Sequence, residues 1–218
     1  MNVESVINKT LDEFTKLKVG NNSDWMKSYK KRAHTSYINE LNYVTKVVSE
    51  GATILEYGSA PFVFTKSLEH LGYHVIGTDI NPFRFDNFEK LNLDVVQVNY
   101  DNEPLPIDSN SIDVIICNEV FEHMRGNLIF TFEEAYRVLK PSGTIHIATP
   151  NLKSLMGIYK FLFKGVCYSC ASDIYHEWSK IEKIGHMGHV REYTANEVST
   201  FLNQIGFEIN SVQFEGLS

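Results

Sequence analysis

The sequence predicts an α/β fold in which a mostly parallel, twisted sheet is covered by helices on both faces. Three observations carry this prediction. Between about residues 53 and 150, short apolar runs alternate with segments whose apolar residues recur at helical spacing. The apolar runs are nearly continuous, which is typical of strands buried on both faces. Past Pro150 the alternation stops, so the strand-helix repeat is confined to about residues 53–150.

The first fifty residues precede this alternation and predict two helices. Apolar residues recur three or four positions apart in two groups, which are Val3, Ile7, Leu11, Phe14 and Leu17, then Tyr37, Leu41, Val44 and Val48. The polar turn between them, "VGNNSD", offers Ser23 or Asp24 as the N-cap of the second helix. Residues 1–50 are therefore expected to form N-terminal helices that pack beside the sheet.

Residues 51–150 form the predicted core. Strands are expected at 53–57, 74–78, 94–98, 112–117 and 143–149, with helices at 62–71 and 127–139 and a short helix from Pro82. Residues 151–192 read as an irregular segment rich in aromatics and histidines, expected to be a lid or substrate segment. Residues 193–218 restore a helix and a last strand. We expect residues 1–218 to be a single domain.

Composition narrows the class of protein. With 218 residues, of which 43% are apolar and 22% charged, the chain is long enough for one substantial core. No apolar run approaches eighteen residues and the N-terminus is polar, so neither a membrane span nor a signal peptide is expected, and the location is expected to be cytoplasmic. The three cysteines predict no disulfide framework. A net charge of −7 disfavours nucleic acid as a partner and leaves the oligomeric state open.

The stretch 53–79 predicts a nucleoside site. A strand ends at Gly58, a helical segment follows, and a second strand closes on Asp79, about twenty residues past the glycine, where a carboxylate accepts hydrogen bonds from ribose hydroxyls. Residues 59–62, Ser-Ala-Pro-Phe, lack the further glycines that let a backbone approach a diphosphate. Glu56 instead indicates a ligand with positive charge beside its ribose, which is what S-adenosylmethionine presents.

Four motifs carry a family resemblance. "ILEYGSA", "VIGTDINP", "LPIDSNSIDVIICNEVFEHM" and "EEAYRVLKPSGTIHIATPN" resemble, in order and spacing, the successive motifs of class I S-adenosylmethionine-dependent methyltransferases, especially the broad type 11 group. The resemblance covers residues 50–150 and "REYTANEVSTFLNQIGFEI". It implies a Rossmann-like sheet ordered 3-2-1-4-5, with strand 6 beyond. The family usually adds an antiparallel strand 7, for which this sequence leaves no room, so we expect the sheet to lack it unless the chain is truncated.

The resemblance also implies roles for individual residues. Ala60 and Phe62 fill places where the family usually has glycine, so the loop is expected to lie farther from the cofactor or to bend differently. The implied cofactor contacts are Glu56 at the aminopropyl group, Gly58, Ser59 and Ala60 in the loop under the methionine part, Asp79 at the ribose, Ile80 against the adenine, Asp101 near its amino group and Asn118 beside the methyl group.

Three polar residues after the fourth strand predict the chemistry. Glu119, Glu122 and His123 lie at i, i+3 and i+4, so they share one face if a helix begins there. Two carboxylates and an imidazole suit either a divalent metal or acid and base catalysis on a hydroxyl acceptor.

A later histidine completes this candidate set. "NEVFEHM" together with "GHVREYT" is similar to metal-dependent small-RNA 2′-O-methyltransferases and also to ubiquinone-biosynthesis O-methyltransferases. That likeness implies Glu119, Glu122, His123 and His189 as metal ligands, with His176 and His186 in the same segment. The alternative is that His123 is only hydrogen-bonded in the cleft wall, as in type 11 enzymes that need no metal. As catalytic residues we predict His123, His189 and Glu119.

The methyl acceptor is the least specified feature. "SLMGIYKFLFKGV" is an apolar amphipathic stretch that suits a lid, a dimer face or a surface for a lipid-linked substrate, and Tyr168, Tyr175 and Trp178 suit stacking on a sugar or a small core of their own. The chain also resembles methyltransferases of surface-polysaccharide or capsule biosynthesis, some linked to methyl phosphoramidate. The expected function is O-methylation of a small-molecule or sugar-linked acceptor. The alternatives are a 2′-O-methyltransferase of RNA ends and a catalytically silent, cofactor-binding partner subunit.

Overall fold

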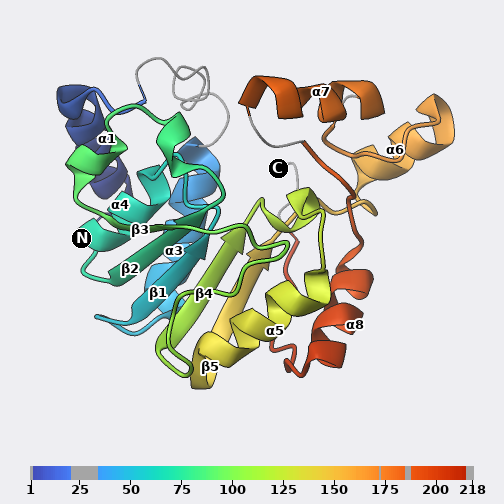
Figure 1. Cartoon of the computed structure of the whole chain (residues 1–218). Helices are drawn as coiled ribbons and strands as arrows, with labels where there is room; N and C mark the ends of the chain where they lie inside the picture. Colours follow the sequence, from blue (N-terminus) through green and yellow to red (C-terminus); the bar gives the residue numbers. More distant parts are fainter. Residues whose placement is uncertain (1, 21–33, 172, 185–187, 215–218) are drawn as a thin grey trace. The chain divides into compact units, whose positions relative to one another are not determined.

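The computed structural model describes residues 2–20, 34–171, 173–184 and 188–214 (Figure 1). Its contacts divide the chain into two compact units. The first comprises Met1–Asn99, Leu105–Cys117 and Val138–His146, and the second comprises Tyr100–Pro104, Asn118–Arg137 and Ile147–Ser218.

Five strands form one sheet. They are β1 (Thr53–Tyr57), β2 (His74–Asp79), β3 (Asp94–Gln97), β4 (Ile112–Asn118) and β5 (Leu139–Ala148), in the order β3-β2-β1-β4-β5. The pairings of β1 with β2 and β4, and of β2 with β3, are parallel, so Tyr57 lies opposite both Thr78 and Cys117. Parallel strands in register end at one edge of the sheet, and this edge carries Gly58 and Asp79. The predicted α/β class and strand order are confirmed.

Three helices of the first unit bury the apolar side chains that the sequence pattern singled out. They are α1 (Val3–Leu17), α3 (His34–Val47) and α4 (Val63–His70). One buried cluster joins them to the strands, and it includes Ile7 of α1, Leu41 of α3, Leu68 of α4, Ile54 of β1 and Ile116 of β4. The short helix predicted from Pro82 is one turn of 3₁₀ helix, η1 (Pro82–Arg84), and a second such turn, η2, spans Phe88–Leu91.

Phe62 takes a left-handed backbone conformation that favours glycine. Its φ is 71° and ψ 2°, in the left-handed region, and α4 begins directly after it. The Phe62 ring is fully buried, stacked on Phe88 with centroids 5.0 Å apart and edge-on to Phe85. The side chain therefore packs in an apolar cluster with α1 and η2, which compensates for a conformation that costs an L residue about 1–2 kcal/mol.

This combination predicts an inverted order of stability at position 62. Phe62→Ala should lose about 3–5 kcal/mol of unfolding free energy through the cavity, and Phe62→Gly should be more stable than Phe62→Ala, because glycine relieves the left-handed strain. Phe64 is the matched control, since it is equally buried but inside α4, where glycine should be about 1 kcal/mol worse than alanine. Denaturant unfolding of the four variants measures both differences. The same order at both positions would contradict this account of Phe62.

The second unit is built mainly from helices. These are η3 (Phe121–His123), α5 (Leu128–Val138), α6 (Leu155–Lys164), α7 (Ile174–Ile184) and α8 (Ala195–Ile205). Phe121 packs edge-on against Phe132, Tyr193 and Phe201, so these four rings form its aromatic core. A capping box between Thr194 and Glu197 begins α8.

Two predictions about this part of the chain are wrong. Residues 151–192 are not irregular, because α6 and α7 lie within them. The side chain of Ser154 caps α6 by accepting from Gly157 N at 3.0 Å, and Gly165, with φ 64°, ends that helix. The last strand is absent, since residues 207–214 have no regular secondary structure. Among the described residues, no helix is both long and apolar enough to cross a membrane.

Candidate functional site

The carboxylate predicted to bind ribose is held at the tip of β2 by backbone N–H groups. Asp79 is 2% exposed, and its two oxygens accept from Ala60 N at 3.2 Å and Asn81 N at 2.8 Å. Arg84 also donates to it at 3.3 Å. Gly58, at the tip of β1, has a φ of 66° that favours glycine. The loop after β1 and the acid of β2 thus contact each other directly.

Gly77, which sequence reasoning did not single out, lets this loop approach β2. A Cβ at Gly77 would lie 2.8 Å from Ser59 Oγ and 2.9 Å from Ser59 Cβ. Ser59 N donates to Thr78 O at 2.9 Å, and Ser59 Oγ is buried with no hydrogen-bond partner among the described residues. A glycine inside a strand is a signal of close backbone approach, so the sequence did contain this information.

Glu56 is buried in the first unit and its acidity is strongly altered. Burial raises the pKa of its carboxyl to about 8, although the hydrogen bond from Thr65 Oγ1, at 2.6 Å, works in the opposite direction. The negative charges of Glu40 and Asp79 raise the pKa further. Glu56 is therefore largely protonated near neutral pH, and a cationic ligand beside it would favour the ionised form.

The remaining predicted cofactor residues lie at element ends. The carbonyl of Ile80 accepts from Gln97 Nε2 at 3.0 Å, and half-buried Asn118 is the last residue of β4. Asp101 Oδ1 accepts from the backbone N–H groups of Arg125, at 3.2 Å, and Gly126, at 2.7 Å. The contacts of Asp101 therefore explain its position without a ligand. Its role near adenine, like the roles of Ile80 and Asn118, stays a prediction.

Three of the four predicted catalytic or metal-binding residues converge in the second unit. One ligand atom each of Glu122, His123 and His189 lies within 4.8 Å of the other two. Oε1 of Glu122 is 3.8 Å from His123 Nε2 and 4.0 Å from His189 Nε2. Glu122 is fully buried, and its other oxygen, Oε2, accepts from Thr149 Oγ1 at 2.9 Å, whereas Oε1 has no hydrogen-bond partner among the described residues. A buried carboxylate oxygen of this kind is costly unless something binds it.

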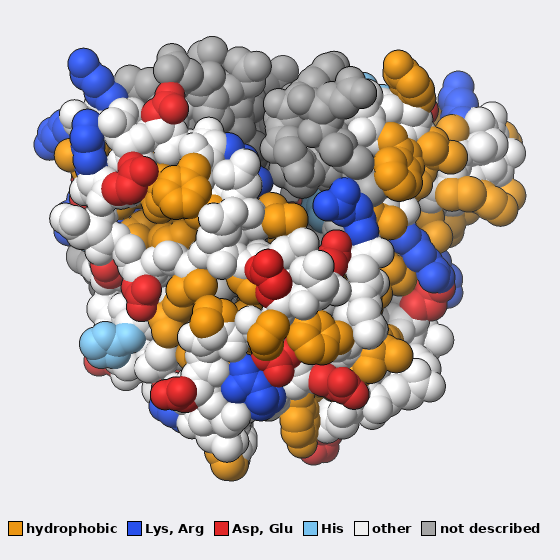
Figure 2. Space-filling model, in the orientation of Figure 1, with side chains coloured by type: hydrophobic (Ala, Val, Ile, Leu, Met, Phe, Trp, Pro, Cys, Tyr) orange, Lys and Arg blue, Asp and Glu red, His pale blue; other side chains and the backbone are white. Residues whose placement is uncertain are grey.

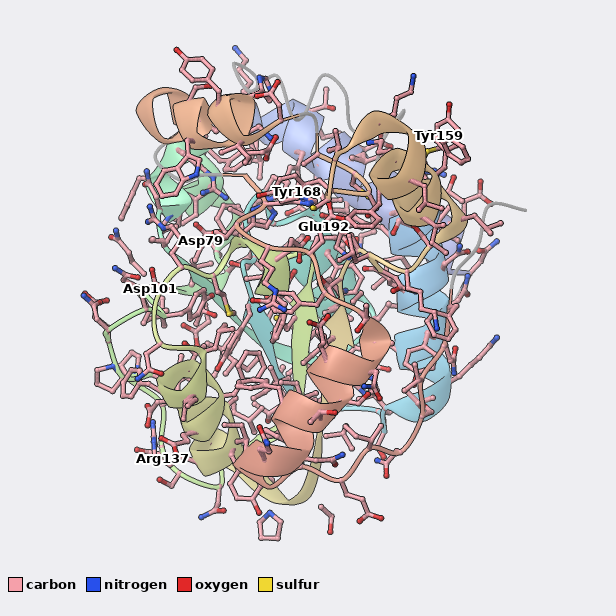
Figure 3. The ribbon with its side chains drawn as sticks, turned by 90° about the vertical axis from the view of Figure 1, so that its right-hand side faces the viewer. Asp79, Asp101, Arg137, Tyr159, Tyr168 and Glu192 are labelled. Carbon is pink, nitrogen blue, oxygen red and sulfur yellow. The ribbon has the colours of Figure 1, made fainter. Side chains whose placement is uncertain are left out.

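Glu192 orients His189 and was missed as a functional residue by sequence reasoning. Its Oε1 lies 2.9 Å from His189 Nδ1, and its carboxylate also accepts from Ser169 N at 2.5 Å, from Cys170 N at 3.1 Å and from the Ser169 hydroxyl. A carboxylate at Nδ1 assigns the proton to that nitrogen, so Nε2 presents its lone pair toward Glu122. Figure 3 shows Glu192 beside Tyr168, whose hydroxyl donates to Val190 O at 3.4 Å. The spacing of three residues between His189 and Glu192 was the available signal.

The electrostatics of this cluster follow from burial and from its own charges. Burial raises the pKa of Glu122. Burial alone would lower the pKa of His189, but the hydrogen bond to Glu192 and the charges of Glu122, Glu192 and Glu177 raise it above its usual value. Burial would raise the pKa of Glu192, yet the hydrogen bonds from His189, Ser169 and Cys170 lower it to about 2. Glu192 is thus the fixed negative charge of the cluster.

Glu119 does not join this cluster, and the predicted helix that would have placed it there is wrong. Only Phe121–His123 form a helical turn after β4, and Glu119 has a φ of 54°, outside the helical region. Its N–H donates to Ala148 O at 2.8 Å and its side chain is exposed. His176 is exposed on α7, and His186 lies outside the described residues.

The donor set fits a divalent metal. Mn²⁺, Fe²⁺, Co²⁺ and Zn²⁺ accept carboxylate oxygens and imidazole nitrogens as ligands. The cluster offers one carboxylate oxygen and two imidazole Nε2 atoms, and a second carboxylate, that of Glu192, supports the imidazole of His189. The same groups can also act as an acid and base pair, with Glu122 or His189 accepting a proton from a hydroxyl.

The comparisons with known proteins bear on this arrangement. The family described as "Methyltransferase domain" matches residues 55–147, which run from β1 into β5. This match covers less than half of the chain, and together with the strand order it supports the fold of a class I S-adenosylmethionine-dependent methyltransferase. The matched region includes Glu56, Gly58 and Asp79 at the strand ends, together with Glu122 and His123. No curated protein matches the chain.

Solved structures share the fold at low identity. A methyltransferase from Methanosarcina mazei is similar with a TM-score of 0.61 and 16% identity, over 80% of this chain and 88% of that one. A protein from Thermotoga maritima described as a possible histamine N-methyltransferase has a TM-score of 0.55 and 17% identity, over 94% and 81%. A Haloferax volcanii complex of a candidate methyltransferase with the Trm112 activator matches with a TM-score of 0.59 and 18% identity, over 86% and 75%. At this identity the likeness shows the methyltransferase fold, not the substrate.

Proposed function

We propose that the methyltransferase domain transfers the methyl group of S-adenosylmethionine to a hydroxyl oxygen of a small-molecule or sugar-linked acceptor. The observation that carries the proposal is the cluster of Glu122, His123 and His189, because a hydroxyl must lose its proton as it attacks the methyl group. Surface polysaccharide, capsule and phosphoramidate-linked sugars are acceptors of this class.

The cofactor half of the proposal rests on the strand ends of the first unit. Asp79 offers a carboxylate for the ribose hydroxyls, and Glu56 offers one that a cationic amino group would ionise. The sulfonium group needs no protein nucleophile, since the acceptor displaces sulfur directly. Orientation of acceptor and cofactor then supplies much of the rate.

The catalytic half assigns each residue of the cluster one task. Glu122 and His189 hold or accept the acceptor's proton, and Glu192 keeps Nε2 of His189 directed at Glu122. Where a divalent metal is bound, Glu122, His123 and His189 are its ligands, and it would lower the pKa of the acceptor hydroxyl. Half-buried Thr149 and buried Glu192 fix the side chains in both versions.

The alternatives are weaker on the same observations. A metal-dependent 2′-O-methyltransferase of RNA ends would use Glu119, which lies outside the cluster, and the net charge of −7 disfavours RNA. A silent partner subunit would bind the cofactor without transferring its methyl group. The presence of a buried, partnered Asp79 and of the polar cluster favours an active enzyme instead.

A screen with methyl-labelled S-adenosylmethionine tests the proposal. The protein is incubated with sugar nucleotides, glycosides, catechols and quinol precursors, capped and uncapped RNA ends, and amines that include histamine, each with EDTA and with Mn²⁺. We expect label in a sugar or another small hydroxyl compound, released by chemistry that cleaves methyl ethers. Label only in amines would contradict O-methylation, and label only in RNA would favour the alternative.

A further inference from the structure

Helix α6 exposes an unusual amount of apolar surface. Its apolar residues are between 42% and 88% exposed, and they are Leu155, Met156, Ile158, Tyr159, Phe161, Leu162 and Phe163. Figure 2 shows hydrophobic side chains gathered on the part of the surface that α6 occupies in Figure 1, and Figure 3 labels Tyr159 on this helix. Isolated apolar residues on a surface are normal, but a contiguous patch marks an interaction site.

The patch covers most of the circumference of the helix. At 100° per residue, the exposed apolar residues occupy an arc of roughly 220°. Part of the remaining arc faces the second unit, and the same arc also carries exposed Lys164. There Gly157 is buried, and a Cβ on it would lie 2.1 Å from Leu152 O, while Lys160 Nζ donates to Ala171 O at 3.4 Å. Only a narrow stripe of α6 therefore contacts its own unit, and the rest of the helix surface is available to a binding partner.

The positive charges near α6 indicate which kind of partner its apolar surface binds. Residues 149–166 contain Lys153, Lys160 and Lys164 and no acidic residue, in a chain whose net charge is −7. An isologous dimer through this face would set the lysines of one copy against those of the other. An apolar face bordered by lysines is instead complementary to an anionic lipid surface, where acyl chains take the apolar residues and headgroups take the ammonium groups.

We propose that α6 is an interfacial membrane helix that inserts its apolar face into an anionic bilayer, parallel to the membrane surface. Ten residues rise only about 15 Å, half of a hydrocarbon core of about 30 Å, so α6 cannot span and must lie in the interface. Lys153 and Lys164 would contact headgroups while the aromatic side chains reach the acyl boundary. This inference stands on α6 alone and is independent of the methyl acceptor.

Vesicle binding tests the inference. The whole protein is sedimented with phosphatidylglycerol vesicles and with phosphatidylcholine vesicles. We expect at least tenfold tighter partitioning to phosphatidylglycerol, a loss of at least tenfold in the variant Phe161→Glu, Leu162→Glu, and a loss of roughly 30-fold on phosphatidylglycerol in Lys153→Gln, Lys164→Gln. Phe214→Glu, at an exposed aromatic residue outside α6, is the matched control and should bind like the wild type.

Two further measurements keep the result unambiguous. Thermal melting establishes that each variant is folded, and hydrogen exchange with vesicles should show new protection confined to residues 152–166. Failure of the folded wild type to bind either vesicle, or equal loss in Phe214→Glu, would overturn the inference. So would a dimer in solution that the Phe161→Glu, Leu162→Glu variant converts to monomer, because α6 would then be a protein interface.

Discussion

Replacing His189 by alanine is expected to lower the rate of methyl transfer about 10²–10⁴-fold, the usual contribution of a positioned acid or base. Its Nε2 lies 4.0 Å from Glu122 Oε1, and no other imidazole besides His123 joins that cluster among the described residues. The rate is measured at saturating S-adenosylmethionine with the acceptor that the screen identifies. His176→Ala is the matched control, since this exposed histidine lies in the same region of sequence and should leave the rate unchanged.

Glu192→Gln separates orientation from direct chemistry. The amide cannot be the fixed negative charge beside Nδ1 of His189, so Mn²⁺ affinity, if a metal is bound, should fall about 10–100-fold. Calorimetry with Mn²⁺ alone reads this out without any acceptor. Anomalous scattering at the manganese edge should then show a peak between Glu122, His123 and His189.

Full activity in the His189→Ala variant would refute both the base and the metal versions of the site.

Replacing Glu56 by glutamine is expected to stabilise the ligand-free protein at alkaline pH. The pKa of Glu56 rises from 4.5 to about 8 in the folded state, so the folded state binds more protons than the unfolded chain between these values. The unfolding free energy contributed by Glu56 is therefore fully present below pH 4.5 and is lost as pH rises through 8. The full displacement corresponds to about 5 kcal/mol, an upper bound on the expected gain in Glu56→Gln at pH 9.

Denaturant unfolding of wild type and Glu56→Gln at pH 5 and pH 9 measures this gain. The difference between the two proteins should be small at pH 5 and large at pH 9. Glutamine keeps an oxygen that accepts from Thr65, so packing is nearly unchanged. Taking the difference also removes contributions from other titrating groups. Equal stability of the two proteins at pH 9 would show that Glu56 is not buried as described.

The sheet and its nucleoside loop were predictable because they depend on local patterns. Strands β1, β2 and β4 each contain a short apolar run, Gly58 follows β1, and Asp79 ends β2. What the sequence could not show was the behaviour of Phe62. A phenylalanine in a glycine place reads as an obstruction, yet its backbone is left-handed and its ring is buried elsewhere, against Phe85 and Phe88. Tertiary packing decides such a position, and local propensity does not.

The polar cluster was predicted in part, because some of its residues follow a local sequence pattern. Glu122 and His123 are adjacent, and a later histidine completes them, which motif spacing could reveal. The prediction for Glu119 assumed a helix directly after β4, but Glu119 has a left-handed backbone and is not part of the group of ligand atoms within 4.8 Å of one another. Glu192 was missed because its role depends on Ser169 and Cys170, more than twenty residues earlier, folding back onto it.

One calorimetric titration directly tests the proposed cofactor site at the ends of β1 and β2. S-adenosylhomocysteine is titrated into the wild type, Asp79→Ala and Arg84→Ala. The arginine variant is the control, because it removes the contact at 3.3 Å but keeps the carboxylate. We expect Asp79→Ala to weaken binding by about 1.5–3 kcal/mol through loss of charge-assisted hydrogen bonds to the ribose, and Arg84→Ala to bind nearly as the wild type does. Equal affinity of Asp79→Ala and wild type, or no binding by the wild type, would contradict the account.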